Sequence, residues 1–188
     1  MQNLDNWPRI IQLAWLLTDE YGAEVKRGKY LIHPDGWVMP TDKFWTDNGF
    51  SQENSIKRGF PIGIVLDLFL GSLDVCDLLV SHNMSFDYHV LGAELLRSRR
   101  KIKKTNKLCT KEIGANFCKI KTQYSNYKWP KLIELHQKLF NKGFDGAHDA
   151  MSDVIACKDC FFELCRLGVI NVHPEEDLLG EMEEDLLG

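Results

Sequence analysis

Short apolar runs separated by turn residues mark the first part of the chain. Residues 9–17 are apolar enough for a buried strand, residues 19–22 suit a turn, and residues 24–32 alternate loosely as a second strand. Two strands joined by a tight turn predict a hairpin. Residues 33–48 are rich in turn residues, and no regular element is predicted there.

The rest of the chain alternates between helical and extended patterns. Helices are predicted where apolar residues recur at spacings of three and four, and strands where short apolar runs follow turns. The predicted helices cover residues 52–58, 64–73, 85–100, 131–140 and 149–167, and the predicted strands cover residues 76–80 and 107–110. This alternation predicts an α/β domain with helices packed on a sheet.

Length and composition are those of one globular domain: 188 residues, of which 44% are apolar and 27% charged. No stretch approaches the roughly 20 apolar residues of a membrane span, and the first residues lack the basic start and apolar middle of a signal peptide. We therefore expect a cytoplasmic protein with no membrane partner, in which the six cysteines stay reduced.

The net charge of −4 is unevenly distributed along the chain. Residues 175–188 hold seven acids and no base, whereas residues 1–174 carry 20 acids and 23 bases, a net charge of +3. We therefore expect one domain over residues 1–172 and an acidic tail over residues 173–188. A solvated, mobile terminus is the favoured interpretation of the tail, and a docking peptide for a protein partner is the alternative.

Cys157 and Cys160 have the C-x-x-C spacing of many zinc sites. Zinc requires a second such pair or two nearby histidines, and this pair lies in a run whose apolar residues recur at helical spacing. Two core cysteines are therefore the favoured interpretation, with a structural zinc module as the alternative.

Two acidic residues interrupt the apolar faces of predicted helices. Asp87 precedes apolar residues at spacings of three, four and eight, and Asp153 precedes such residues at spacings of three, four, seven and eleven. Each acid alone is explained by its place in a first helical turn, where a carboxylate suits the helix dipole. Together they indicate a site, because buried carboxylates are usually paired or bound to a metal.

Both acids stand close to polar residues at expected loop positions. The tripeptide Ser-His-Asn at 81–83 directly follows the predicted strand 76–80, and ligands often bind at the carboxyl ends of sheet strands. His148 suits a loop just ahead of the last helix, from which its imidazole can reach the Asp153 carboxylate. An imidazole in this position suits a general base that activates water.

These segments resemble motifs of the DEDD 3′–5′ exonuclease superfamily. SHNMSFDYHVLGAELL (81–96) resembles its second motif, and AHDAMSDVIACKDCFFEL (147–164) resembles the third motif of the histidine-bearing DEDDh branch. Residues 8–22 are similar to the strand that follows the first motif. The resemblance implies a ribonuclease H-like exonuclease fold, with a mixed sheet flanked by helices, and removal of single nucleotides from the 3′ end of DNA or RNA.

The resemblance also implies roles for individual residues. In this superfamily four acids hold two divalent metals that clamp the scissile phosphate, with Mg²⁺ as the natural ion and Mn²⁺ as a substitute. Carried over by position, Asp87 and Asp153 are catalytic, metal-binding acids and His148 is the base. The expected partners are single-stranded DNA or RNA 3′ ends and, for the acidic tail, a polymerase or another protein. The expected substrate-binding residues are His82, Asn83 and Phe86.

One part of the family pattern is missing. The first motif, Asp-x-Glu on the first strand, should lie just ahead of residue 8, but residues 1–7 read MQNLDNW. Two of the four acids are then absent, together with a central strand that pairs with the strands expected at 9–17 and 76–80. A fragment or mis-started frame of an active exonuclease is the favoured interpretation. A shortened protein that binds nucleic acid or a partner without cutting is the alternative.

Two further clusters give weaker signals for substrate binding. Seven basic residues between 97 and 107 suit either a phosphate-binding strip or a solvated helix end with a basic loop. Tyr124, Tyr127 and Trp129 suit base stacking, although packing under a loop is the favoured interpretation, and a core position is the favoured interpretation for Phe86.

Overall fold

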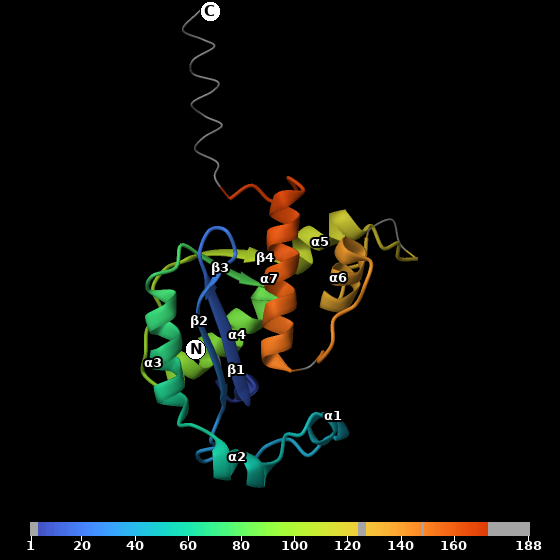
Figure 1. Ribbon diagram of the computed structural model, residues 1–188. Helices are drawn as coiled ribbons and strands as arrows, with labels where there is room; N and C mark the ends of the chain where they lie inside the picture. Colours follow the sequence, from blue (N-terminus) through green and yellow to red (C-terminus); the bar gives the residue numbers. More distant parts are fainter. Residues whose placement is uncertain (1–3, 124–126, 148, 173–188) are drawn as a thin grey trace, which may run out of the picture.

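The computed structural model describes residues 4–123, 127–147 and 149–172, and it contains the predicted hairpin (Figure 1). Strand β1 (Gln12–Thr18) pairs antiparallel with β2 (Glu24–Leu31). Asp19 closes the turn between them, because its Oδ1 accepts hydrogen bonds from the backbone N–H groups of Tyr21 and Ala23. Aspartate favours turns for this reason.

Trp15 anchors the hairpin to the rest of the fold and is buried. Its ring lies against Gly28 of β2, where an added Cβ would come within 2.4 Å of the indole. The indole N–H donates a 3.0 Å hydrogen bond to Ser72 Oγ on α3 (Ile62–Leu73). A glycine opposite the tryptophan therefore gives the indole the space it occupies in this core.

A second strand pair follows in the chain. Strand β3 (Leu78–Ser81) pairs in parallel with β4 (Asn106–Cys109), and α4 (Met84–Arg97) lies between them in sequence. A helical crossover is the usual connection between parallel strands. Strand β3 and helix α4 correspond to the strand and the helix predicted on either side of the tripeptide at 81–83. Their observed ends differ from the predicted ends by up to three residues.

Five further helices and a short 3₁₀ turn are described. They are η1 (Leu4–Asn6), α1 (Lys43–Asp47), α2 (Gln52–Arg58), α5 (Thr110–Cys118), α6 (Leu132–Phe140) and α7 (Ala150–Arg166). The sequence pattern predicts α2, α6 and α7 but neither α1 nor α5. None of the helices in the described part of the chain is long and apolar enough to cross a membrane.

Helix α7 stands beside both strand pairs (Figure 1). It packs on β1 and β3, while α3 packs on β1 and β2 and α4 packs on β3 and β4. One apolar core joins the hairpin to α3 and α4 and includes Trp15, Leu66 and Leu91. A second core, around α6 and α7, includes Leu135 and Leu164. The predicted α/β arrangement, with helices packed on the strands, is therefore confirmed.

The strands form two separate sheets of two strands each. The pair β1 and β2 makes one sheet and the pair β3 and β4 makes the other, and within the described residues no ladder joins β1 to β3. The sequence predicts a mixed sheet that lacks the central strand between β1 and β3. The structure has the antiparallel pair and the parallel pair in two separate sheets rather than in one continuous mixed sheet.

A buried carboxylate fixes the segment ahead of β1 against α4. Glu94 is 1% exposed, and its Oε1 accepts hydrogen bonds from Arg9 Nε at 2.7 Å and Arg97 Nη1 at 3.2 Å. Arg97 Nη2 also donates to the carbonyl oxygens of Leu4 and Trp7, at 2.6 and 2.8 Å. The two guanidinium groups compensate the cost of burying the Glu94 charge.

Candidate functional site

The two predicted acids lie on helices that pack on the same strand, β3. Asp87 lies in the first turn of α4, and Asp153 lies in the first turn of α7. Burial above all, together with the nearby carboxylates of Asp87 and Asp153, raises the pKa of the Cys157 thiol to about 12. Two acids that are far apart in sequence therefore act on the same buried group.

Asp87 is solvent-exposed yet closely surrounded by protein groups. The Ser81 hydroxyl, at the end of β3, donates a hydrogen bond to Asp87 Oδ2, and Ser81 Oγ accepts one from Asn83 N at 3.2 Å. Desolvation raises the pKa of Asp87, and the Ser81 hydroxyl and the Lys111 ammonium offset that effect only in part. A carboxyl group with a raised pKa, just after a strand end, is a candidate for chemistry.

His82 belongs to a chain of hydrogen bonds that ends at Cys157. Its Nε2 lies 3.0 Å from the carbonyl oxygen of Pro130, which can only accept, so Nε2 carries the proton. Burial lowers the pKa of His82, so the ring is neutral near pH 7 and Nδ1 accepts from the Thr110 hydroxyl at 3.0 Å. The Thr110 oxygen then accepts from the Cys157 thiol at 3.7 Å. Both ring nitrogens are thus used within the protein, and substrate binding by His82 stays a prediction.

Asn83 connects the site to an exposed aromatic surface. Its Oδ1 accepts a 3.1 Å hydrogen bond from Lys111 Nζ, and that ammonium lies 5.1 Å from the ring centroid of Trp129. Trp129 is 57% exposed, Phe86 50% and Tyr127 41%. The expected packing of Trp129 and Tyr127 under a loop is therefore wrong, and so is the core alternative for Phe86, because all three rings face solvent.

Some predicted features lie outside the described residues, namely His148, Tyr124 and the tail 173–188. The proposed general base is among them, so its role stays a prediction. Asp153 is partly buried and takes part in an interaction within the protein.

Asp149 is a neighbour of the site that the sequence analysis did not single out. It caps α7, because its carboxylate accepts a 3.2 Å hydrogen bond from Ser152 N, and Lys29 of β2 pairs with it. Burial raises the pKa of Asp149, but the hydrogen bonds from Lys29 and Ser152 outweigh burial and leave the pKa below its usual value. An aspartate directly ahead of a helical apolar pattern is an N-cap signal that identifies such a residue.

The described residues do not complete a metal centre. Among them, no three His, Cys, Asp or Glu side chains are grouped so that they could hold an ion. Asp87 and Asp153 supply two carboxylates, whereas the two-metal arrangement implied by the resemblance uses four. The site as described therefore does not fit two metal ions.

The cysteine pair is equally unsuited to zinc. Cys157 and Cys160 are both buried in the core, as the favoured interpretation of the sequence holds. Burial is the main cause that raises the pKa of each thiol to about 12. Zinc binds the thiolate, and burial in an apolar environment opposes that form.

Much of the predicted basic cluster is used within the fold. Four of its side chains contact other parts of the chain, namely Arg97, Arg100, Lys103 and Lys107. The clearest case is Arg100, whose guanidinium donates two hydrogen bonds of 2.6 and 2.7 Å to the Asp67 carboxylate. These contacts favour a structural role for the cluster over a continuous phosphate-binding strip.

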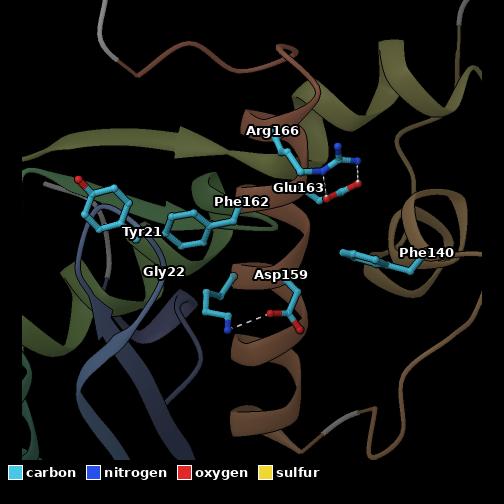
Figure 2. Close-up of a pocket in the computed structure, with 8 residues that line it drawn as sticks. Tyr21, Gly22, Phe140, Asp159, Phe162, Glu163 and Arg166 are labelled. Atoms are coloured by element: carbon cyan, nitrogen blue, oxygen red, sulfur yellow. Dashed lines mark hydrogen bonds and ion pairs between the residues drawn. The ribbon is translucent and has the colours of Figure 1, made fainter.

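A surface pocket lies farther along α7 and contains none of the predicted site residues (Figure 2). It is lined by Tyr21, Gly22, Phe140, Lys158, Asp159, Phe162, Glu163 and Arg166. Its charged side chains pair with one another, Lys158 with Asp159 at 2.9 Å and Arg166 with Glu163 at 2.6 Å. Because these charges neutralise one another, the pocket is a weaker candidate site than the one at Asp87 and Asp153.

Similarity to known proteins is found in structure rather than in sequence. No family model matches the chain, and no curated protein matches it. E. coli exonuclease I in complex with a dT13 oligonucleotide superposes with a TM-score of 0.67 at 15% identity, covering 94% of this chain and 39% of that chain. A zinc-bound complex of the same enzyme with single-stranded DNA gives 0.65 at 16% identity, with 83% and 36% covered.

The nuclease domain of 3′hExo, a DEDDh family member bound to rAMP, superposes with a TM-score of 0.65 at 17% identity. That match covers 86% of this chain and 82% of the 3′hExo domain, whereas the chain spans little more than a third of exonuclease I. Identities this low establish the fold alone. The described chain therefore has the α/β, ribonuclease H-like fold of the DEDDh exonucleases.

Proposed function

We propose that this chain is a 3′–5′ exonuclease domain for DNA or RNA, with Asp87, Asp153 and His148 as its catalytic residues. The observation that carries the proposal is that Asp87 and Asp153 stand in the first turns of α4 and α7, two helices that pack on the same strand, β3, and are linked by hydrogen bonds from His82 through Thr110 to Cys157. The fold shared with the DEDDh exonucleases supports it, and exonuclease I, one of the similar structures, is seen with single-stranded DNA.

The two described carboxylates set a limit on what this chain does by itself. They are too few for a pair of Mg²⁺ or Mn²⁺ ions, the cofactors that the resemblance implies. We therefore propose that the described part of the chain binds the 3′ end. Removal of nucleotides requires further carboxylates at the same place.

The surface beside the acids suits the end of a single strand. Trp129 offers an exposed ring for base stacking, and Lys111, which contacts both Trp129 and Asn83, offers a positive charge for a phosphate. Phe86 is a second exposed ring, directly before Asp87. His82 bonds Thr110, next to Lys111, and the carbonyl oxygen of Pro130, next to Trp129, and so holds the segments that carry these two side chains close to the start of α4.

The second candidate is a protein of the same fold that binds nucleic acid or a partner and never cleaves. The incomplete set of carboxylates favours it. The two candidates differ in one respect: an exonuclease regains cleavage when the missing carboxylates are supplied. A cytoplasmic location and a protein partner for the acidic tail are further proposals that fit either candidate.

Fluorescence anisotropy with a labelled single-stranded oligonucleotide, in EDTA, tests the binding of 3′ ends. The control is the same oligonucleotide closed into a circle, and DNA and RNA versions of both separate the two substrates. We expect the linear form to bind more tightly than the circle. Equal affinity for linear and circular forms would overturn 3′-end recognition.

Substitution of Trp129 by alanine tests the proposed stacking surface. Loss of one stacked base costs about 1–3 kcal/mol, so we expect the affinity of the linear oligonucleotide to fall by roughly 5- to 150-fold. Lys57→Ala, in the exposed part of α2, is the matched control and should leave affinity unchanged. Unchanged affinity of the Trp129→Ala variant would mean that the nucleic acid does not bind at this surface.

A further inference from the structure

Helix α3 is apolar on its outer face as well as on the face that it buries. Leu66 and Phe69 pack into the core shared with the hairpin, whereas Ile64 and Leu68 are 54% and 36% exposed. Asp67 is the single charged residue of this helix. A helix that is apolar all round is normally buried on all sides. Within the part of the chain that the structure describes, the outer face of α3 is left uncovered.

The exposed residues of this outer face form one stripe along the helix. The stripe consists of Ile64, Leu68, Gly71 and Val75, which follow one another at spacings of four, three and four and are all exposed. Asp74 keeps helical backbone angles after the last residue of α3, so Val75 continues the same line. Figure 1 shows α3 at the outer side of the fold, with the hairpin between it and α7. A contiguous apolar stripe in such a place marks an interaction surface.

The charges beyond the stripe have opposite signs at its two ends. At the end where α3 begins, the exposed basic residues Lys57 and Arg58 close α2, and Phe60, which is 48% exposed, extends the apolar surface. At the other end the acids Asp74 and Asp77 are exposed. The stripe is therefore bordered by positive charge at one end and by negative charge at the other.

The stripe is complementary to itself. Its spacings read the same from either end, so a second copy laid antiparallel places Leu68 of each copy opposite Gly71 of the other, and Ile64 opposite Val75. A Cβ added at Gly71 would meet no atom within 4 Å, so the space beside Gly71 is open to a large side chain. Large residues therefore oppose smaller ones along the whole stripe, as close packing of two helices requires.

Charge favours the same antiparallel arrangement. When two copies lie antiparallel, the basic end of each meets the acidic end of the other, whereas a parallel pair brings like charges together. Midway along the helix the Arg100 guanidinium bonds the Asp67 carboxylate, so no unpaired charge there repels a second copy. The acidic tail at 173–188 is less suitable as an occupant, because Asp74 and Asp77 repel it at one end of the stripe.

The open edge of the hairpin is a poorer surface for self-association. Strand β2 pairs with β1 alone among the described residues, so its other edge is free. Three exposed basic side chains follow this strand, namely Lys26, Arg27 and Lys29. Charged side chains, lysine above all, protect edge strands from pairing with another chain. Helix α3 has no such protection along its stripe.

We propose that α3 is a dimer interface, in which two copies of this chain pack antiparallel along the stripe and Arg58 of each copy lies beside Asp77 of the other. The interface is small, so it gives a concentration-dependent dimer rather than a permanent one. The stripe contains none of the candidate site residues, and the proposal therefore stands or falls independently of the proposed function.

Sedimentation equilibrium of the full chain over a range of concentrations, in EDTA and without nucleic acid, tests the proposal. We expect a monomer–dimer equilibrium whose dissociation constant rises by about tenfold or more in Leu68→Glu, because that variant buries a charge against Gly71 of the other copy. Leu167→Glu is the matched control, since Leu167 is 43% exposed at the end of α7, and it should leave the constant unchanged. A monomer at every concentration would overturn the proposal, and so would an equal constant for wild type and Leu68→Glu.

Exchange of charges between the two ends tests the antiparallel arrangement with exposed residues, whose substitution does not disturb the core. Arg58→Glu alone and Asp77→Arg alone each bring like charges together at both ends of the dimer, so each should raise the dissociation constant by about threefold or more. An equimolar mixture of the two variants restores opposite charges at both ends and should dimerise as well as wild type. A mixture that dimerises no better than either variant alone would overturn the antiparallel interface.

Discussion

Asp87 is the residue at which function and stability oppose each other. Its carboxyl group sits where desolvation raises its pKa, so the charged form that a ligand site needs is the form that the folded protein disfavours. Functional sites commonly keep such groups at the expense of stability. The Ser81 hydroxyl that bonds Asp87 keeps the carboxylate oriented despite its exposure to solvent.

Asp87→Asn should therefore stabilise the chain at neutral pH. Folding raises the pKa of Asp87, so the protonated carboxyl group stabilises the folded chain. This contribution is complete below the usual aspartate pKa and is lost as the pH rises through the raised pKa of the folded state. We expect melting temperatures equal to wild type near pH 3 and higher than wild type at pH 7. Calorimetry at both pH values checks this, with Asp67→Asn as the comparison, since the pKa of Asp67 is lowered by its hydrogen bond with Arg100. A variant less stable than wild type at pH 7 would contradict the desolvation of Asp87.

Glu94 shows which residues the sequence could not identify. It lies in the resembling motif, but its burial depends on Arg9, which is 85 residues away in the chain. Removal of one partner from a buried ion pair leaves uncompensated charge and costs about 3–5 kcal/mol. We expect Glu94→Ala to lower the free energy of unfolding by that amount in urea titrations, and Glu94→Gln to cost less, because it keeps the shape and an acceptor. A loss below about 1 kcal/mol would mean that this pair does not anchor the segment ahead of β1.

At the scale of elements, helices and strands are predicted correctly where apolar residues recur regularly over many positions or alternate with polar residues. The hairpin, α4 and α7 are all recognisable from spacing. Helix α5 is not, because it begins at Thr110 directly after β4, without turn residues to separate a strand from a helix. Helix α1 has five residues and buries none of them, so it leaves no apolar pattern.

Two glycines provide a matched test of the hairpin packing. Gly28→Ala places a methyl group against the Trp15 ring, and overpacking of this kind costs about 1–3 kcal/mol. Gly71→Ala, on the exposed side of α3, meets no atom within 4 Å and should stabilise by about 0.5–1 kcal/mol through helix propensity. Chemical denaturation of both variants checks the pair. Equal effects of the two substitutions would contradict the close fit of Trp15 on β2.

At the scale of the whole molecule, the candidate site lies beside both strand pairs. Asp87 stands just after the end of β3, and Asp153 stands in the first turn of α7, whose first residue donates a hydrogen bond to Gln12 at the start of β1. The sequence predicted that these two acids belong to one site from their places on the apolar faces of two helices. The sequence could not predict that several residues of the basic cluster make contacts within the protein, such as that of Arg100 with Asp67. Those contacts depend on the tertiary fold.

The salt dependence of nucleic-acid binding follows from the whole charge distribution. Seven free basic residues on a single strand would give a slope of log affinity against log salt near about −5. Because four of the seven are engaged within the fold, we expect a shallower slope, of about −2 or less in magnitude. Anisotropy titrations between 50 and 200 mM salt measure the slope. A slope near about −5 would instead mean that the basic cluster binds the phosphates.

The most direct measurement is one incubation of a 5′-labelled single-stranded oligonucleotide with this chain in Mg²⁺ or Mn²⁺, divided between a native and a denaturing gel, with an EDTA control. We expect a shifted complex on the native gel and full-length oligonucleotide on the denaturing gel, because the described residues bring together only two of the four carboxylates that two-metal cleavage needs. A metal-dependent ladder that shortens from the 3′ end would contradict the incomplete site, and the absence of any complex would contradict 3′-end binding.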